Sequence, residues 1–204
     1  MYQPKKYQKT DRHYFLDFIN HHPFATFVTQ GDRLLATHLP FLTKGEADSF
    51  RLFSHMANHN EQFPFLKDGS EALVIFQGAH SYVSSSWYRE KNISTWDYSA
   101  AHVNVRIRLQ TRAELEYCLE ELVAHFEQEQ AAPLFYKDIP KDMLLEHLPQ
   151  ITGFWCEPIH IQGIAKLHQG YEKEDVNSVT SHLKGSGDPL AEKLSIDIQK
   201  EHGI

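Results

Sequence analysis

One segment constrains the fold of this 204-residue chain more than any other, because a strand pattern runs directly into a helix pattern. Val103-Asn-Val-Arg-Ile-Arg-Leu109 alternates apolar and polar residues without a break, which predicts a strand with one buried face. Thr111 and Glu114 then form a capping-box signature. Apolar residues recur at helical spacing from Leu115 to Phe126. The segment therefore predicts a half-buried strand followed at once by an amphipathic helix.

The N-terminal part of the chain predicts one helix and one antiparallel pair of strands. Asp11 precedes a set of aromatic and aliphatic residues at helical spacing, and Pro23 should end that helix. Residues 24–29 and 34–39 are rich in β-branched and aromatic residues, and Gly31 begins a turn between them. These features predict a β-hairpin.

The middle of the chain gives a mixture of shorter signals. Residues 54–60 lack strand alternation and predict a helical turn that opens at Ser54. Residues 72–76 form an apolar run, typical of a strand buried on both faces, which Gly78 should end. A short helix is expected near 141–148. Residues 151–167 predict two strands separated near Gln162-Gly163.

The C-terminal residues are more polar and predict helices. Asp175 could cap one short helix, and residues 185–187 separate it from a second at 190–199. We see no internal repeat and no second core, so we expect one domain over residues 1–183 followed by a helical tail at 184–204. The expected class is mainly β with flanking helices.

Composition and charge limit the cellular setting and the partners. Two cysteines without a C-x-x-C spacing are typical of free thiols in a reducing compartment. We find neither an export signal nor a run of about 18 apolar residues, so we expect a cytoplasmic protein that does not enter a membrane. The net charge of −7 opposes binding to nucleic acid through phosphates.

Four segments carry polar and aromatic residues that a packed sheet would not need. They are Ala36-Thr-His-Leu-Pro-Phe41, Ser54-His-Met-Ala-Asn-His-Asn60, His80-Ser-Tyr-Val-Ser-Ser-Ser-Trp-Tyr88 and Ser94-Thr-Trp-Asp-Tyr98. In the same order they resemble the A-T-H-L-P-F, G-H-x-A-R-x-N, A-Y-I-S-P-S-W-Y and P-T-W-N-Y patterns of the PaiB family. The segment Gly163-Ile-Ala-Lys-Leu-His-Gln169 is similar to the family's G-K-x-K-L-S-Q-N. The likeness extends from Met1 to about Leu183.

This resemblance implies a split β-barrel like that of the pyridoxamine phosphate oxidases, a homodimer, and FMN bound at the subunit interface. The family name also implies repression of sporulation and protease genes. Carried onto this chain, the family site predicts cofactor contacts from these residues: Thr37, His38, Leu39, Ser54, His55, Asn58, Ser84, Ser86, Trp87, Tyr88, Trp96 and Lys166.

The assigned roles follow from the chemistry of FMN. A phosphate needs N–H and hydroxyl donors with some positive charge, which Ser54, His55, Asn58 and Lys166 could supply. The ring needs flat partners, which the tryptophans at 87 and 96 and the tyrosine at 88 could supply; core or interface packing is the alternative for each of them.

Some positions depart from the family patterns. Ser85 replaces a proline, Asn58 replaces an arginine, and His168 and Gly170 interrupt the K-L-S-Q-N ending. An amide cannot reproduce the bidentate contact of a guanidinium with phosphate. These departures bear on the phosphate of the cofactor more than on its ring.

Other kinds of site have weaker support in the sequence. His55 and His59 form one i, i+4 pair, but no further cysteine or acidic ligand lies nearby, so we predict no metal site. The run Ser84–Ser86 lacks a G-x-S-x-G elbow, and no catalytic residue is assigned.

The leading hypothesis is an FMN-binding PaiB-like transcriptional regulator that acts indirectly or through a redox or ligand signal. We do not expect direct DNA binding, because the helix after Thr111 is acidic and no basic recognition helix follows. The alternatives are a flavin-dependent oxidoreductase, in which FMN carries the electrons, and a split-barrel scaffold that has lost FMN.

Overall fold

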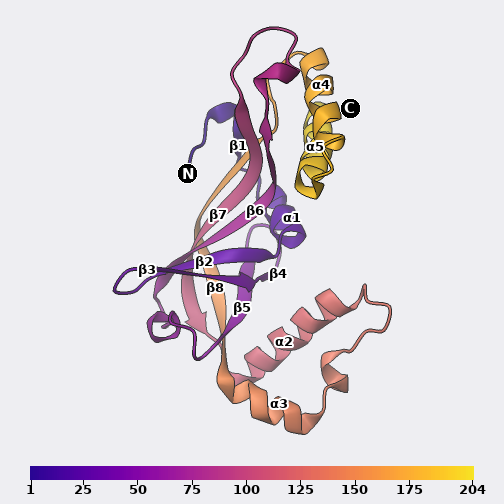
Figure 1. Cartoon of the computed structure of the whole chain (residues 1–204). Helices are drawn as coiled ribbons and strands as arrows, with labels where there is room; N and C mark the ends of the chain where they lie inside the picture. Colours follow the sequence, from indigo (N-terminus) through magenta and orange to yellow (C-terminus); the bar gives the residue numbers. More distant parts are fainter. The chain divides into compact units, whose positions relative to one another are not determined.

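The computed structural model describes residues 1–204, and its strands form one eight-stranded sheet with flanking α-helices (Figure 1). The strand order is β3-β2-β6-β7-β8-β5-β4, with β1 paired to β8. The strands are β1 Gln8–Lys9, β2 Phe24–Gln30, β3 Leu34–Pro40, β4 Leu42–Lys44, β5 Arg51–Ala57, β6 Glu71–Val83, β7 Thr95–Leu109 and β8 Ile151–Lys166. The helices are α1 Arg12–His21, α2 Arg112–Glu127, α3 Lys141–His147, α4 Lys173–Lys184 and α5 Pro189–His202. The predicted class, mainly β with flanking helices, is confirmed.

The strand-to-helix segment folds as its pattern predicts. Along β7, Val103, Val105 and Ile107 are buried while the residues between them lie toward solvent. The Thr111 hydroxyl accepts a hydrogen bond from the Glu114 backbone N–H, and the Glu114 carboxylate accepts one from the Thr111 N–H. Both halves of the predicted capping box are therefore present. The predicted hairpin of β2 and β3 is also confirmed.

The helical turn predicted to open at Ser54 is wrong, because residues 54–57 belong to strand β5 and the chain turns only at 58–60. The ladder pairs β5 antiparallel with β4 on one side and with β8 on the other. Leu52, Phe53 and Met56 are buried in this arrangement. Backbone hydrogen bonds to two neighbours and the burial of three large side chains outweigh the weak local alternation.

Two strands are longer than predicted, because glycine does not end them. β6 continues through Gly78 to Val83, beyond its pairing with β2, which covers Ala72 to Ile75; its other neighbour in the sheet is β7. β8 is a single strand, and Gly163 lies directly against the Phe15 ring, where an added Cβ would be 2.3 Å from a ring carbon. Gly163 therefore permits close packing and does not mark a break.

Asp175 does not cap its helix as predicted. The N-cap of α4 is Glu172, and Asp175 lies in the first helical turn. Its carboxylate accepts a hydrogen bond of 3.1 Å from the backbone N–H of Arg89. The Asp175 carboxylate therefore binds a residue that is distant in the sequence and does not cap its own helix.

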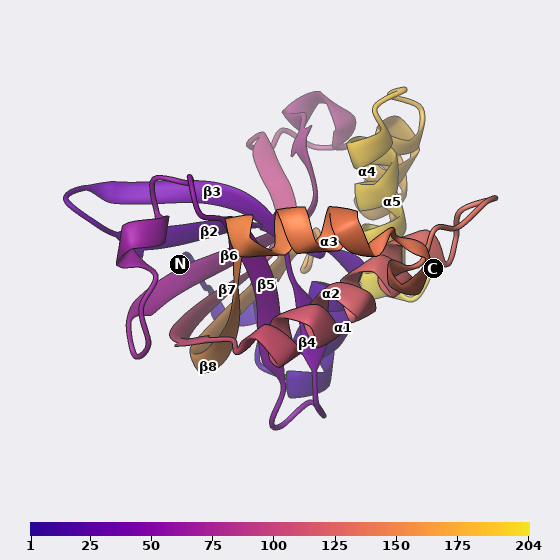
Figure 2. The same ribbon diagram turned by 90° about the horizontal axis from the view of Figure 1, so that it is seen from below.

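The chain divides into two compact units with separate apolar clusters. Unit 1 contains 1–18, 77–102 and 162–204, and unit 2 contains 19–76 and 103–161. In unit 1, α4 and α5 lie side by side and bury Val179, Leu183 and Leu194 (Figure 1). In unit 2, α2 lies against β4 and β5 (Figure 2). This contact buries Cys118 and Leu122.

Candidate functional site

Unit 1 presents a group of exposed aromatic rings on strands β6 and β7. His80 and Tyr82 are two residues apart on β6, and therefore project from the same face of the strand. The Trp96 ring on β7 lies 5.9 Å from the His80 ring and 6.4 Å from the Tyr82 ring, centroid to centroid. Trp96 is 51% exposed and Tyr82 is 47% exposed. We call these three residues the aromatic face, a surface that can pack against a planar ligand.

A polar atom at the edge of the aromatic face has no partner. The Nδ1 atom of His80 is buried and makes no hydrogen bond. A buried polar atom without a partner costs free energy, and a bound group could satisfy it. The aromatic face thus combines flat surface with a free hydrogen-bonding atom, the two features that a heteroaromatic ring requires.

Lys166 is the last residue of β8, and its ammonium contacts three consecutive residues of β7. Its Nζ donates hydrogen bonds to the Thr95 hydroxyl and, at 2.7 Å, to the Trp96 carbonyl, and forms an ion pair with the Asp97 carboxylate at 3.2 Å. Two of the three N–H donors of the ammonium are used in hydrogen bonds, and its charge is paired with a buried carboxylate. Lys166 is therefore engaged inside unit 1.

Asp97 joins Lys166 to a second titratable residue, His168. The Nδ1 atom of His168 lies 2.7 Å from the second carboxylate oxygen of Asp97, and both side chains are buried. His168 has a backbone φ of 67°, which is uncommon for a residue other than glycine. Its ring stacks on Tyr171 at a centroid distance of 4.1 Å, and its Nε2 atom is buried without a partner. We call Asp97, Lys166 and His168 the Asp97 triad.

Of the other residues predicted in unit 1, most have internal partners. The Trp87 ring stacks on His182 at 4.9 Å, and Tyr88 is buried against Tyr171. Burial raises the pKa of Tyr88 above its usual range. Ser84 and Ser86 hydrogen-bond to each other at 2.8 Å.

The residues predicted on β3, in unit 2, lie near the surface. Thr37 accepts a hydrogen bond of 3.0 Å from the Asn60 side chain, and His38 stacks on Phe24 at 5.9 Å. Leu39 is half-buried on the same strand. The Thr37 hydroxyl keeps its own hydrogen and the His38 ring is exposed, so both can contact a ligand.

The residues predicted from 54 to 58 in unit 2 are more enclosed. Ser54 is buried, and its hydroxyl donates to the Pro40 carbonyl at 2.7 Å. The Asn58 amide donates to the Pro149 carbonyl, and its oxygen accepts from the Thr152 hydroxyl. Burial lowers the pKa of His55, so its imidazole is neutral at pH 7 and its buried Nδ1 has no partner.

The ring and the phosphate of FMN do not fit the chain equally well. The aromatic face offers a planar surface with a free polar atom, which fits a flavin ring. Ser54, Asn58 and Lys166 all have internal partners, and His55 carries no charge at pH 7. As arranged, these four side chains do not fit a phosphate.

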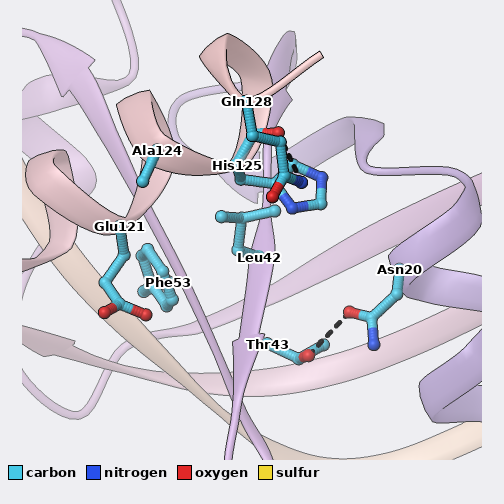
Figure 3. A pocket seen from close by; sticks show the side chains of 8 residues that line it. All are labelled: Asn20, Leu42, Thr43, Phe53, Glu121, Ala124, His125 and Gln128. Atoms are coloured by element: carbon cyan, nitrogen blue, oxygen red, sulfur yellow. Dashed lines mark hydrogen bonds between the residues drawn. The ribbon is translucent and has the colours of Figure 1, made fainter. Parts of the chain in front are cut away.

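A separate pocket of about 440 Å³ lies in unit 2, against α2 (Figure 3). Leu42 and Phe53 supply apolar surface, and the Thr43 hydroxyl donates to the Asn20 side chain at 2.7 Å. Its remaining lining comes from Glu121, Ala124 and His125 on one face of α2 and from Gln128, which follows the helix. None of the residues predicted for FMN lines this pocket.

Sequence reasoning did not assign a role to Asp97 or predict the pairing of Asp97 with His168. A signal was present, because the P-T-W-N-Y pattern has asparagine where this chain has Asp97, and the K-L-S-Q-N pattern has serine where it has His168. The two departures are 71 positions apart and meet in one hydrogen bond. His80 and Tyr82 of the aromatic face were also not among the predicted contacts, and the strand that carries them was predicted to end at Gly78.

Fold and site together define a split-barrel protein with a surface suited to a planar aromatic ligand. The chain belongs to the family described as "Putative FMN-binding domain", whose model matches residues 1–160. It is 30% identical over 196 residues to "Protease synthase and sporulation protein PAI 2" of Bacillus subtilis, covering 96% of this chain and 95% of that one. The PaiB resemblance seen in the motifs is thereby confirmed.

Solved structures confirm the predicted split-barrel fold. The FAD and heme binding protein from Mycobacterium smegmatis superposes with a TM-score of 0.63 at 18% identity, covering 84% of this chain and 79% of that chain. The flavocytochrome Anf3 from Azotobacter vinelandii gives a TM-score of 0.57 at 12% identity, covering 83% and 74%. None of the helices in the present structure is long and apolar enough to span a membrane.

Proposed function

We propose that this chain is a flavin-binding protein of the PaiB group, and that it binds the isoalloxazine ring of FMN on the aromatic face. The observation that carries the proposal is the exposed Trp96 ring beside His80 and Tyr82, in a chain whose family is described as FMN-binding. Exposed aromatic groups of this kind commonly mark a binding surface. The Mycobacterium smegmatis protein of similar fold is named for FAD binding, which supports a flavin as the ligand class.

A direct test is titration of the purified chain with FMN, followed by quenching of flavin fluorescence. We expect Trp96→Ala to weaken binding roughly tenfold, because a base-sized ring stacked on an aromatic side chain contributes about 1–3 kcal/mol. Phe126→Ala is a matched control, since Phe126 is an exposed aromatic residue on α2. Equal FMN affinity in the Trp96→Ala variant and the wild-type chain would refute the aromatic face as the ring site.

We further propose that the bound flavin makes the chain a redox- or ligand-responsive regulator that affects its genes indirectly. The name of the Bacillus subtilis relative refers to protease synthesis and sporulation. The net charge of −7 and the acidic α2 helix oppose direct contact with DNA phosphates. A salt-dependent mobility shift of promoter DNA by the purified chain would contradict the indirect part of this proposal.

We also propose that the chain forms a homodimer, with the flavin near the interface. Exposed aromatic residues on the strands are of the type enriched in protein interfaces. Light scattering coupled to size exclusion should give twice the monomer mass of 23.7 kDa. If the chain is a monomer and still binds flavin, the site is not completed by a second copy, and this proposal is wrong.

A further inference from the structure

Three consecutive residues of β7, among them Asp97 of the triad, hold the one lysine that the sequence assigned to the cofactor. The Lys166 ammonium donates hydrogen bonds to Thr95 and Trp96 and forms an ion pair with Asp97, and its side chain is only 14% exposed. A phosphate could bind this ammonium only by displacing one of these acceptors. Displacement of Asp97 would leave a buried carboxylate without its cation, which is strongly unfavourable.

His168 makes that displacement harder, because it fixes the other oxygen of the same carboxylate. An ionised carboxylate can only accept, so the Nδ1 atom of His168 carries the hydrogen in their 2.7 Å contact. The His168 segment is itself fixed: Gln169 accepts from the Leu167 N–H and donates to the Ala165 carbonyl, at 2.8 and 2.7 Å. Asp97 is thus oriented toward Lys166 by a partner that cannot easily move.

We propose that Asp97, oriented by His168, is a specificity-determining residue that withdraws Lys166 from phosphate binding. The aromatic face then selects a flavin by its ring and not by its phosphate. This inference rests on the proposed flavin function for the nature of the ligand, and on the Asp97 triad alone for the state of Lys166. The wild-type chain is accordingly expected to bind riboflavin and FMN with similar affinity.

The first test uses inorganic phosphate and needs no flavin. Asp97→Asn keeps the size of the side chain and removes the counter-ion of Lys166, so phosphate affinity should rise roughly tenfold, the effect of one charge-assisted hydrogen bond. Binding is measured by NMR shifts of residues 95–97 and 166 at constant ionic strength. The rise should vanish in Asp97→Asn/Lys166→Gln, and should be absent in Asp197→Asn, which removes a charge from a surface pair with Lys193 in the same unit.

The second test compares FMN with riboflavin. In Asp97→Asn, the ratio of FMN affinity to riboflavin affinity should rise roughly tenfold, while riboflavin affinity stays constant. If no variant binds either flavin, the proposed function fails, and the phosphate titration still decides the role of Asp97. If the wild-type chain already prefers FMN by tenfold and loses that preference in Lys166→Gln, Lys166 binds the phosphate and the inference is overturned.

A third measurement covers the case in which Asp97→Asn does not fold. The wild-type lysines are acylated in trace amounts at pH 8, and the products are read by peptide mass spectrometry. Lys166 should react roughly tenfold more slowly than Lys193, because a buried, paired ammonium is not nucleophilic. Addition of phosphate should leave the Lys166 rate unchanged. Equal rates at the two lysines, or protection of Lys166 by phosphate, would contradict the proposal.

Discussion

Unit 1 and unit 2 each contain a carboxylate that joins a cation to a second polar partner, and they differ in burial. Asp97 in unit 1 is 1% exposed and contacts Lys166 and His168. Glu114 in unit 2 is 31% exposed and accepts two hydrogen bonds from Arg108, at 2.6 and 3.2 Å. It also accepts from the Trp155 indole at 3.1 Å. Similar chemistry is thus placed once in the interior and once at the surface.

The environment of such a carboxylate, more than the number of its contacts, determines how much it contributes to the free energy of unfolding. Water screens Glu114 and can replace a lost partner, so its ion pair contributes little free energy. Asp97 is buried away from water. Removal of its side chain would therefore leave Lys166 and His168 buried without a compensating partner. The two sites should therefore respond very differently to the same truncation.

The largest effect is expected for Asp97→Ala. The variant leaves the Lys166 ammonium and the His168 ring buried without their acceptor, which should lower the free energy of unfolding by roughly 3–5 kcal/mol. Urea unfolding followed by tryptophan fluorescence measures the loss. Asp197→Ala is the control, and a loss below about 1 kcal/mol in Asp97→Ala would show that the triad is weakly coupled to the fold.

Glu114→Ala should cost less, about 1–2 kcal/mol of unfolding free energy. It removes one half of the capping box and the carboxylate that contacts Arg108, and a lost cap costs about 1 kcal/mol. The same urea experiment measures it. Glu116→Ala, which removes an exposed i, i+4 partner of Arg112, is the control. An equal loss of unfolding free energy in both variants would show that the capping box adds no stability of its own.

The pH dependence of this contribution has a defined sign. Hydrogen bonds from Arg108, and then from the Thr111 backbone, lower the pKa of Glu114 from 4.5 to about 2. Because the folded-state pKa lies below the unfolded value, the stabilisation is fully present above pH 4.5 and is lost as pH falls toward 2. The difference in unfolding free energy between wild type and Glu114→Gln should shrink between pH 5 and pH 2. A constant difference over that range would contradict the lowered pKa.

The smallest effect is expected for Lys193→Ala on α5. Lys193 and Asp197 form an exposed i, i+4 pair at 3.4 Å, and such pairs contribute about 0.2–0.5 kcal/mol. Thermal unfolding at low and high salt measures the change, which salt should abolish. A loss comparable to that of Asp97→Ala would break the distinction between buried and surface carboxylates.

The sequence alone determined those features that depend on neighbouring residues. Alternation along Val103–Leu109 gave the buried face of β7, and the pair Thr111 and Glu114 gave the start of α2, because strand and helix periodicities and capping bonds act within a few residues. The ordered motifs also indicated the family and its fold. These features needed no knowledge of distant contacts.

Only the tertiary structure decided the rest. Ser54 became part of a strand because β8 pairs with it at Phe154, and Gly163 lies inside β8 because the Phe15 ring occupies the space of a side chain. Asp97 and His168 meet across 71 positions, and their contact decides what Lys166 can bind. Such contacts depend on where distant segments are brought together, which local periodicity does not encode.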